Sequence, residues 1–411
     1  MMYQLLIPTH LSHLTSLIKQ CLSAAEEQGM DTSAIEVGTS ETTDVCIQVD
    51  NKCFRLSVSF DSPLDEAAAM SLLLQMNGSD EKSLLVTYGS ESIVDNQIAI
   101  DANTGNINSD VFRIDGLIKS VPSVTTLKTL TDKEKHLSWL AASIVLDFPI
   151  EDAVILARVA SQSDVSRETW PTVPSQFPLP LLEDRELGIK LGWDNSEPVS
   201  FPIMEADSLG LYPVVDDVVW IERLLKLGIK TIQLRIKDRH HPELAEQVQK
   251  AICLGREFKA QVFINDYWEL AIEHGAYGIH LGQEDLEVAD LKAISEAGIR
   301  LGLSTHGYYE IQRIQQLSPS YIALGHIHPT TTKVMPSKPQ GLVRLKLYQD
   351  LIGDFPTVAI GGIDLNRASE VWQCGVSSLA VVRAITLSSD PKAVIAEFNQ
   401  VMNEKRPSDV S

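Results

Sequence analysis

The sequence predicts an α/β protein in which a separate mixed α/β N-terminal domain precedes a C-terminal (β/α)8 barrel, the TIM-barrel fold. Two observations lead to this prediction. From about residue 204 onward, short apolar runs typical of buried strands alternate with helical stretches about eight times. Before that point, residues 170–202 are rich in proline and irregular, as expected of a connection between two domains.

The expected domain boundaries follow these changes in pattern. Four segments are predicted: a mixed domain at 1–180, a linker at 181–203, the barrel at 204–403 and a tail at 404–411. The eight expected barrel strands are residues 210–214, 231–236, 261–264, 278–281, 300–303, 321–324, 357–360 and 378–382. An open, doubly wound sheet is the alternative, but no GxGxxG motif follows the first of these strands.

The first 180 residues mix short strand and helix candidates. The expected strands are residues 3–8, 46–60 with a turn at Asp50-Asn51, 84–88, 97–101 and 111–114. The expected helices are residues 11–28, 63–76, 132–146 and 150–160.

Composition limits the possible partners and the cellular compartment. The chain has 411 residues with 55 acidic against 34 basic side chains, and its net charge of -21 disfavours nucleic acid or an anionic membrane as a general partner. Its five cysteines are scattered without a CxxC pair, which suggests neither a disulfide framework nor a zinc site. Without an export signal or a membrane-spanning apolar run, a cytoplasmic location is expected.

The stretch YIALGHIHPTTTK, residues 321–333, has the pattern of a buried strand that ends in an anion-binding loop. Pro329 stops the strand, and three threonines followed by Lys333 supply hydroxyls and a cation. An ordinary solvated turn would also explain this loop taken alone. The anion-binding interpretation gains weight because polar residues also follow the other predicted strands, at the end of the barrel where chemistry takes place.

The second expected strand carries Gln233, Arg235 and Lys237 on one face, because side chains alternate along a strand. A solvated edge strand would also tolerate this pattern. Inside a buried strand, however, unpaired cations are costly, so an anionic ligand is the better explanation.

Asp266 and Asp285 follow the third and fourth expected strands, which are neighbours in the barrel. Two carboxylates in this arrangement could hold Mg²⁺ while a diphosphate supplies further oxygens. Either aspartate could instead cap a helix. The cations expected opposite them favour the metal.

The remaining strand ends carry further candidates. Ser304 is expected at the mouth, His306 could cap the next helix or touch substrate, and His280 lies inside an apolar strand as a core histidine. After strand seven, Gly361 and Gly362 expose backbone N–H groups beside the loop of strand eight, which ends Val381-Val382-Arg383-Ala384. This is the usual position for a monophosphate in this fold.

Six motifs, in this order, resemble thiamine phosphate synthase of the proteobacterial branch, over residues 204–400. They are QLRIKD at 233–238, INDYWELAI at 264–272, GIHLGQEDL at 278–286, LGLSTH at 301–306, PTTTK at 329–333 and AIGGI at 359–363. Where relatives often have phenylalanine and serine, this chain has His328 and Arg383. Arg383 could strengthen phosphate binding or be solvated, and His328 affects the packing of the loop.

The resemblance implies a transferase of thiamine biosynthesis that joins 4-amino-5-hydroxymethyl-2-methylpyrimidine diphosphate to a thiazole phosphate with Mg²⁺. It implies that the pyrimidine diphosphate is bound by Gln233, Arg235, Lys237, Asn265 and Lys333, with Ser304 near the reacting ring and Mg²⁺ on Asp266 and Asp285. The thiazole phosphate would be held by Thr330, Thr332, Gly362 and the backbone at Val382 and Arg383. Arg235, Lys237, Ser304 and Lys333 are the expected catalytic residues.

Two other functions remain open at this point: a thiazole tautomerase-like paralogue and a non-catalytic sensor of thiamine precursors. The expected partners are small-molecule substrates, and a homo-oligomer is possible.

The N-terminal domain is similar to the C-terminal part of ribokinase-like hydroxymethylpyrimidine phosphate kinases, in the segments LVTYGSES and FPIEDAVILARVASQS. Such kinases need a glycine-rich turn to hold phosphate. Here no glycine lies between Gly116 and Gly188, so Asp132 stands without the glycines of that turn. The expectation is a catalytically dead remnant or a structural appendage.

Overall fold

The computed structural model describes residues 3–60, 82–90, 93–103, 108–123, 125–162, 169–191, 199–330 and 338–404. The predicted helix at 63–76 and the loop residues Thr331, Thr332 and Lys333 lie outside these ranges. Two compact units are present, Met1–Ile189 with Gly307–Arg313, and Lys190–His306 with Ile314–Ser411. Within the described ranges, no helix has the length and apolar character needed to cross a membrane.

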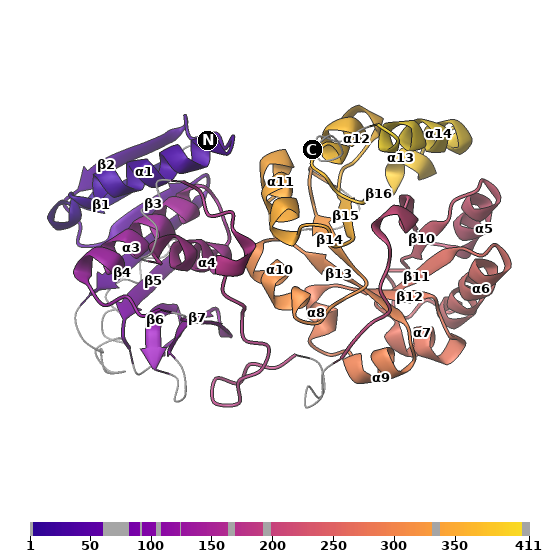
Figure 1. Cartoon of the computed structure of the whole chain (residues 1–411), viewed down its shortest axis with the longest axis horizontal. Coiled ribbons are helices and arrows are strands. Elements are labelled where there is room, and N and C mark those ends of the chain that lie inside the picture. Colours follow the sequence, from indigo (N-terminus) through magenta and orange to yellow (C-terminus); the bar gives the residue numbers. More distant parts are fainter. Residues whose placement is uncertain are drawn as a thin grey trace. The chain divides into compact units, whose positions relative to one another are not determined.

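The N-terminal unit is built on one mixed sheet in the order β2-β1-β3-β4-β5-β6-β7-β8 (Figure 1). The strands are β1 Tyr3–Pro8, β2 Ile35–Ser40, β3 Val45–Val49, β4 Lys52–Ser59, β5 Lys82–Tyr88, β6 Gln97–Asn103, β7 Asn108–Ile114 and β8 Leu117–Pro122. The pairs β1/β2, β4/β5 and β5/β6 are parallel and the others antiparallel. The predicted turn at Asp50-Asn51 joins β3 to β4, with Asp50 at φ 54°.

Helices α1 Leu14–Glu27, α3 Leu130–Val145 and α4 Ile150–Ser161 pack side by side along this sheet. Short 3-10 helices lie at η1 Thr9–Leu11 and η2 Pro174–Gln176. The guanidinium of Arg158, a fully buried residue of α4, bonds to Asp110 through Nε at 2.6 Å and to Asp101 through NH2 at 3.0 Å. Because buried charges require partners, this ion cluster fixes α4 against β6 and β7.

The second unit contains the predicted (β/α)8 barrel, which confirms the fold class. Eight parallel strands close in the order β10-β11-β12-β13-β14-β15-β16-β9. They are β9 Leu211–Val215, β10 Thr231–Leu234, β11 Gln261–Asn265, β12 Gly278–Leu281, β13 Arg300–Thr305, β14 Tyr321–Gly325, β15 Thr357–Ile360 and β16 Ser378–Val381.

Amphipathic helices alternate with these strands. They are α5 Val218–Lys226, α6 Leu244–Glu257, α7 Trp268–His274, α8 Gln283–Leu286, α9 Leu291–Glu296, α10 Tyr308–Gln315, α11 Gly341–Ile352, α12 Leu365–Trp372, α13 Arg383–Thr386 and α14 Pro391–Met402, with η3 Ala206–Ser208 before the first strand. Helix α5 is representative, because Asp217 caps it by accepting from Trp220 N while Ile221 and Leu224 are fully buried.

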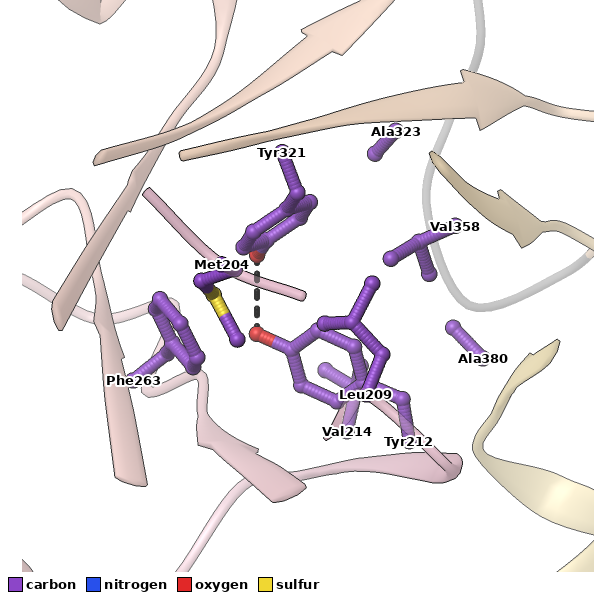
Figure 2. Packing of buried hydrophobic residues seen from close by; sticks show 9 residues of the cluster. All are labelled: Met204, Leu209, Tyr212, Val214, Phe263, Tyr321, Ala323, Val358 and Ala380. Carbon is purple, nitrogen blue, oxygen red and sulfur yellow. Dashed lines mark hydrogen bonds between the residues drawn. The ribbon is translucent and has the colours of Figure 1, made fainter. Parts of the chain in front are cut away.

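Aromatic side chains fill the barrel interior (Figure 2). Tyr212, Phe263 and Tyr321 pack with Met204 and Leu209 in one buried cluster. Two glycines make room for these rings. A Cβ at Gly278 would lie 2.2 Å from the ring of Phe263, and one at Gly302 would lie 2.1 Å from Cζ of Tyr321. The interior is therefore a packed core, and any site must lie at one end of the strands.

Candidate active site

A cavity of about 630 Å³ lies at the carboxyl ends of the barrel strands, and all eight strands contribute to its lining. This volume suits small organic substrates. Ten of the residues singled out in the sequence line it: Gln233, Arg235, Asn265, Asp266, Asp285, Ser304, Thr330, Gly362, Val382 and Arg383. Lys237 has an exposed side chain and is not brought to the wall, while Thr332 and Lys333 lie outside the described residues.

Basic side chains follow strand β10 on one side of the cavity. The backbone N–H of Arg235 donates to Val215 O at 2.7 Å, which continues the pairing of β10 with β9 and holds Arg235 at the rim. Arg239, which was not predicted, also lines the cavity and pairs with Asp285 at 3.2 Å. Strand alternation gives no signal for Arg239, because β10 ends at Leu234 and Lys237, two residues before Arg239, does not line the cavity.

Asp266 and Asp285 line the same cavity and neither caps a helix. Helix α7 has Tyr267 at its N-cap without a side-chain bond, and Asp285 lies within α8. Asp266 adopts φ 66°, and its backbone N–H donates to His280 O at 3.0 Å. No group of three or more His, Cys, Asp or Glu that could hold a metal occurs in the described ranges. A metal here would need oxygens from a ligand as well.

The loop after β14 runs against the loop after β15. Ile327 N donates to Ile360 O, and His328 N donates to Gly361 O, both at 3.0 Å. Gly361 and Gly362 have φ values of 107° and 64°, which favour glycine. A Cβ on Gly362 would lie 2.6 Å from Pro329 O. The two glycines therefore let the segment between β14 and Thr330 pass close to the backbone of Gly361 and Gly362, where a phosphate could bind.

Of the two departures from the family pattern, His328 lies in this loop pair and Arg383 follows β16. His328 is half-buried, its Nε2 has no hydrogen-bond partner within the described ranges, and burial lowers its pKa, assisted by the charge of Arg367. The guanidinium of Arg367 donates to Gly362 O at 2.8 Å. Arg383 is exposed at the start of α13 and lines the cavity, so it can face a bound anion.

Histidines line the cavity at the ends of strands β12, β13 and β14. His280 is buried as expected of a core histidine, with Nε2 2.8 Å from Ser304 Oγ and Nδ1 2.8 Å from Tyr321 Oη, but it also reaches the cavity wall. His306 and His326 are lining residues as well. Burial lowers the pKa of His326, assisted by the charge of His306. His326 could not be singled out from the sequence, because a single histidine after a strand is common.

Comparison with known proteins places these residues in a family. The model described as "Thiamine monophosphate synthase" matches residues 211–385, which lie in the barrel. Thiamine-phosphate synthase of Citrobacter koseri is 60% identical over 190 residues, which is 46% of this chain and 90% of that protein. That of Proteus mirabilis is 57% identical over 197 residues, or 48% of this chain and 92% of that protein.

The chain belongs to the thiamine-phosphate synthase family. It is therefore a transferase of thiamine biosynthesis, and the tautomerase-like and sensor alternatives are not favoured. Among solved structures, thiamine phosphate pyrophosphorylase of Pyrococcus furiosus is similar, with a TM-score of 0.44 and 28% identity, covering 48% of this chain and 96% of that one.

Proposed function

We propose that the barrel cavity joins 4-amino-5-hydroxymethyl-2-methylpyrimidine diphosphate to 4-methyl-5-(2-phosphoethyl)thiazole, giving thiamine phosphate and pyrophosphate. One observation carries this proposal. A single cavity holds two regions suited to anions, the rim at Arg235 and Arg239 and the glycine loop at Gly361-Gly362. Two phosphorylated substrates could therefore be held in one space with their reactive parts adjacent.

The pyrimidine diphosphate belongs on the side of β10. We expect Arg235 at the cavity wall to neutralise charge that develops on the leaving pyrophosphate. The family resemblance gives the same role to Lys237, which is exposed and does not line the cavity, and to Lys333, which lies outside the described residues. The bond of the pyrophosphate to the methylene group can ionise first, because the electron-rich aminopyrimidine stabilises the resulting carbocation. The thiazole nitrogen then attacks this carbocation, and the scheme demands no strong general base.

Mg²⁺ is the proposed cofactor, held by Asp266 and Asp285 together with the diphosphate. The donor set fits, because Mg²⁺ commonly takes one or two protein carboxylates and completes its shell with water and substrate phosphates. The ion pair between Arg239 and Asp285 shows that a positive charge is already accommodated at this carboxylate. When bound, the ion would neutralise charge on the leaving group.

We expect the thiazole phosphate to bind at the loops after β15 and β16. We expect it to be held by backbone N–H groups at Gly362, Val382 and Arg383 and by the hydroxyl of Thr330, and the family resemblance adds Thr332, which lies outside the described residues. Phosphate at the loops after strands seven and eight is the common arrangement in this fold.

A steady-state assay of thiamine phosphate, detected as fluorescent thiochrome, tests the proposal. Wild-type protein with both substrates and Mg²⁺ should form product, and an absence of product would remove the synthase function. Lys333→Ala or Asp266→Ala should lower kcat by about 100-fold or more, or about 2.7 kcal/mol in the barrier. A loss below about threefold would contradict the roles given to these residues.

For the N-terminal unit we propose a degenerate, kinase-like domain without kinase activity. Helix α3 begins with a capping box, in which Thr129 Oγ1 accepts from Asp132 N and Asp132 Oδ2 accepts from Thr129 N, both at 3.1 Å. Side chains thus satisfy N–H groups that a phosphate would otherwise use. The full chain should not phosphorylate hydroxymethylpyrimidine phosphate with ATP, and measured turnover would refute this.

A further inference from the structure

A continuous chain of hydrogen bonds crosses the barrel interior beneath the cavity. Ser304 Oγ lies 2.8 Å from His280 Nε2, and Nδ1 of that ring lies 2.8 Å from Tyr321 Oη. Tyr321 Oη lies 2.8 Å from Tyr212 Oη (Figure 2), and Gln233 Nε2 donates to Tyr212 Oη at 3.4 Å. We call these five residues the tyrosine relay. It links strands β13, β12, β14, β9 and β10.

The relay begins and ends in the cavity but is buried between. Gln233, His280 and Ser304 line the cavity, whereas Tyr212 and Tyr321 are 1% and 0% exposed. Burial raises the pKa of both phenols far above the ordinary value, so each keeps its proton at neutral pH. Gly302, whose missing Cβ leaves room for the ring of Tyr321, shows that this position is shaped to hold the phenol.

Counting protons couples the direction of each hydrogen bond in the relay to that of its neighbours. A tyrosine hydroxyl has one proton, and the His280 ring in its neutral form has one N–H, so in the simplest arrangement each member donates to one neighbour and accepts from the other. With Gln233 donating to Tyr212, Tyr212 donates to Tyr321, and Tyr321 donates to His280 Nδ1. The Nε2–H of His280 then donates to Ser304 Oγ, and the Ser304 proton is directed toward the cavity.

The two ends of the relay are consequently complementary. In this direction Ser304 offers the cavity a donor, and the Oε1 atom of Gln233 remains as an acceptor. Turning the Gln233 amide by a half-turn reverses every donor, so that Ser304 becomes the acceptor and Gln233 the donor. Neither direction presents two donors or two acceptors.

We propose that the tyrosine relay selects the pyrimidine ring of the diphosphate substrate by the positions of the hydrogen-bond donors and acceptors on that ring. An amino group beside a ring nitrogen matches the direction in which Gln233 donates inward. A 4-oxopyrimidine, which carries a carbonyl beside a ring N–H, matches the reversed direction of the relay. Tyr212, Tyr321 and His280 are positioning residues in this role, and the inference rests on the proposed synthase function.

The test compares two substrates in three proteins. The ratio of kcat/KM for the 4-amino and 4-oxo pyrimidine diphosphates is measured in wild type, Tyr321→Phe and Tyr277→Phe. Tyr277 is the matched control, because its ring packs on Phe263 but its hydroxyl lies outside the relay. Comparing this ratio between proteins cancels the different intrinsic reactivities of the two substrates.

Tyr321→Phe should lower this ratio by at least about tenfold and leave the KM for thiazole phosphate within about twofold, because the ends of a broken relay reorient independently. Tyr277→Phe should match wild type. A ratio in Tyr321→Phe within twofold of wild type overturns the proposal. If Tyr321→Phe does not fold, Tyr212→Phe, which breaks the relay one step further along, carries the same expectation.

A spectroscopic measurement separates failure of the relay from failure of the synthase function, because it needs no turnover. In ¹⁵N-histidine spectra, with the His280 signals identified by their loss in His280→Gln, wild type should show the Nε2–H tautomer of His280. Tyr321→Phe removes the donor to Nδ1 and should shift the tautomer population. An unchanged His280 spectrum overturns the relay even if wild type makes no thiamine phosphate.

Discussion

Replacing Gly362 by alanine tests whether the glycine loop positions the thiazole phosphate. Gly362 has φ 64°, a conformation that costs an alanine about 1–2 kcal/mol. A Cβ there would also lie 2.6 Å from Pro329 O and 2.8 Å from His328 Cβ, so the backbone that leads to Thr330 must move. Such overpacking adds about 1–3 kcal/mol, giving a total loss of stability of about 2–5 kcal/mol.

Gly298→Ala is the matched control for this variant. Gly298 has φ 66°, but a Cβ there would meet no atom within 4 Å, and the residue is exposed between α9 and β13. Gly298→Ala should lose about 1–2 kcal/mol of stability, the cost of the backbone conformation alone, and should keep wild-type kinetics. Chemical denaturation measures both stabilities, and initial rates at varied thiazole phosphate measure binding.

Gly362→Ala should raise the KM for thiazole phosphate by about tenfold or more, while the KM for the pyrimidine diphosphate changes little. This selectivity is expected because the displaced backbone belongs to the thiazole side of the cavity. If both variants lost stability equally and retained the same KM for thiazole phosphate, the close approach of Pro329 to Gly362 would have no role in binding.

Three further predictions concern charged groups. Arg239→Gln should change the free energy of unfolding by less than about 0.5 kcal/mol, because its ion pair with Asp285 is exposed. The same variant should lower the Mg²⁺ concentration for half-maximal activity, since Arg239 no longer pairs with Asp285, and an unchanged Mg²⁺ titration would contradict Asp285 as a ligand. Burial raises the pKa of Asp152 from 3.8 to about 7, so the folded protein holds this proton more tightly than the unfolded one. The free energy of unfolding should therefore fall as pH rises from about 4 to 7. Asp152→Asn should reduce this dependence on pH, as measured by denaturation curves at several pH values. Arg158→Leu leaves two buried carboxylates unpaired and should cost about 3–5 kcal/mol in chemical denaturation, whereas a loss below about 1 kcal/mol would show that the ion cluster does not hold α4.

The barrel could be predicted from sequence because each of its strands is an apolar run covered on both faces. In the N-terminal unit, β2 and β8 were not predicted. These are the edge strands of the sheet, and their residues, IEVGTS and LIKSVP, are largely half-buried or exposed, so neither shows a clear alternation. The predicted helix at 11–28 begins at Leu14, because Thr9–Leu11 forms a 3-10 turn first.

The candidate site could be predicted only where one strand end carries its own signal. Gln233 and Ser304 lie near the ends of β10 and β13, Asp266 directly follows β11, and parallel strands bring such ends together. Contacts across the barrel have no local signal. Tyr212 and Tyr321 lie 109 residues apart, and each by itself reads as a core aromatic residue. The relay therefore depends on register and packing, which the sequence alone does not provide.

A ³¹P NMR time course of the wild-type protein with both substrates and Mg²⁺ tests the central claim most directly. Joining the two substrates in one cavity predicts that the diphosphate signals of the pyrimidine give way to pyrophosphate while the thiazole phosphate signal gives way to thiamine phosphate, in equal amounts. Omitting the thiazole phosphate should prevent formation of thiamine phosphate. Unchanged spectra, or pyrophosphate released without thiamine phosphate when both substrates are present, would contradict the account.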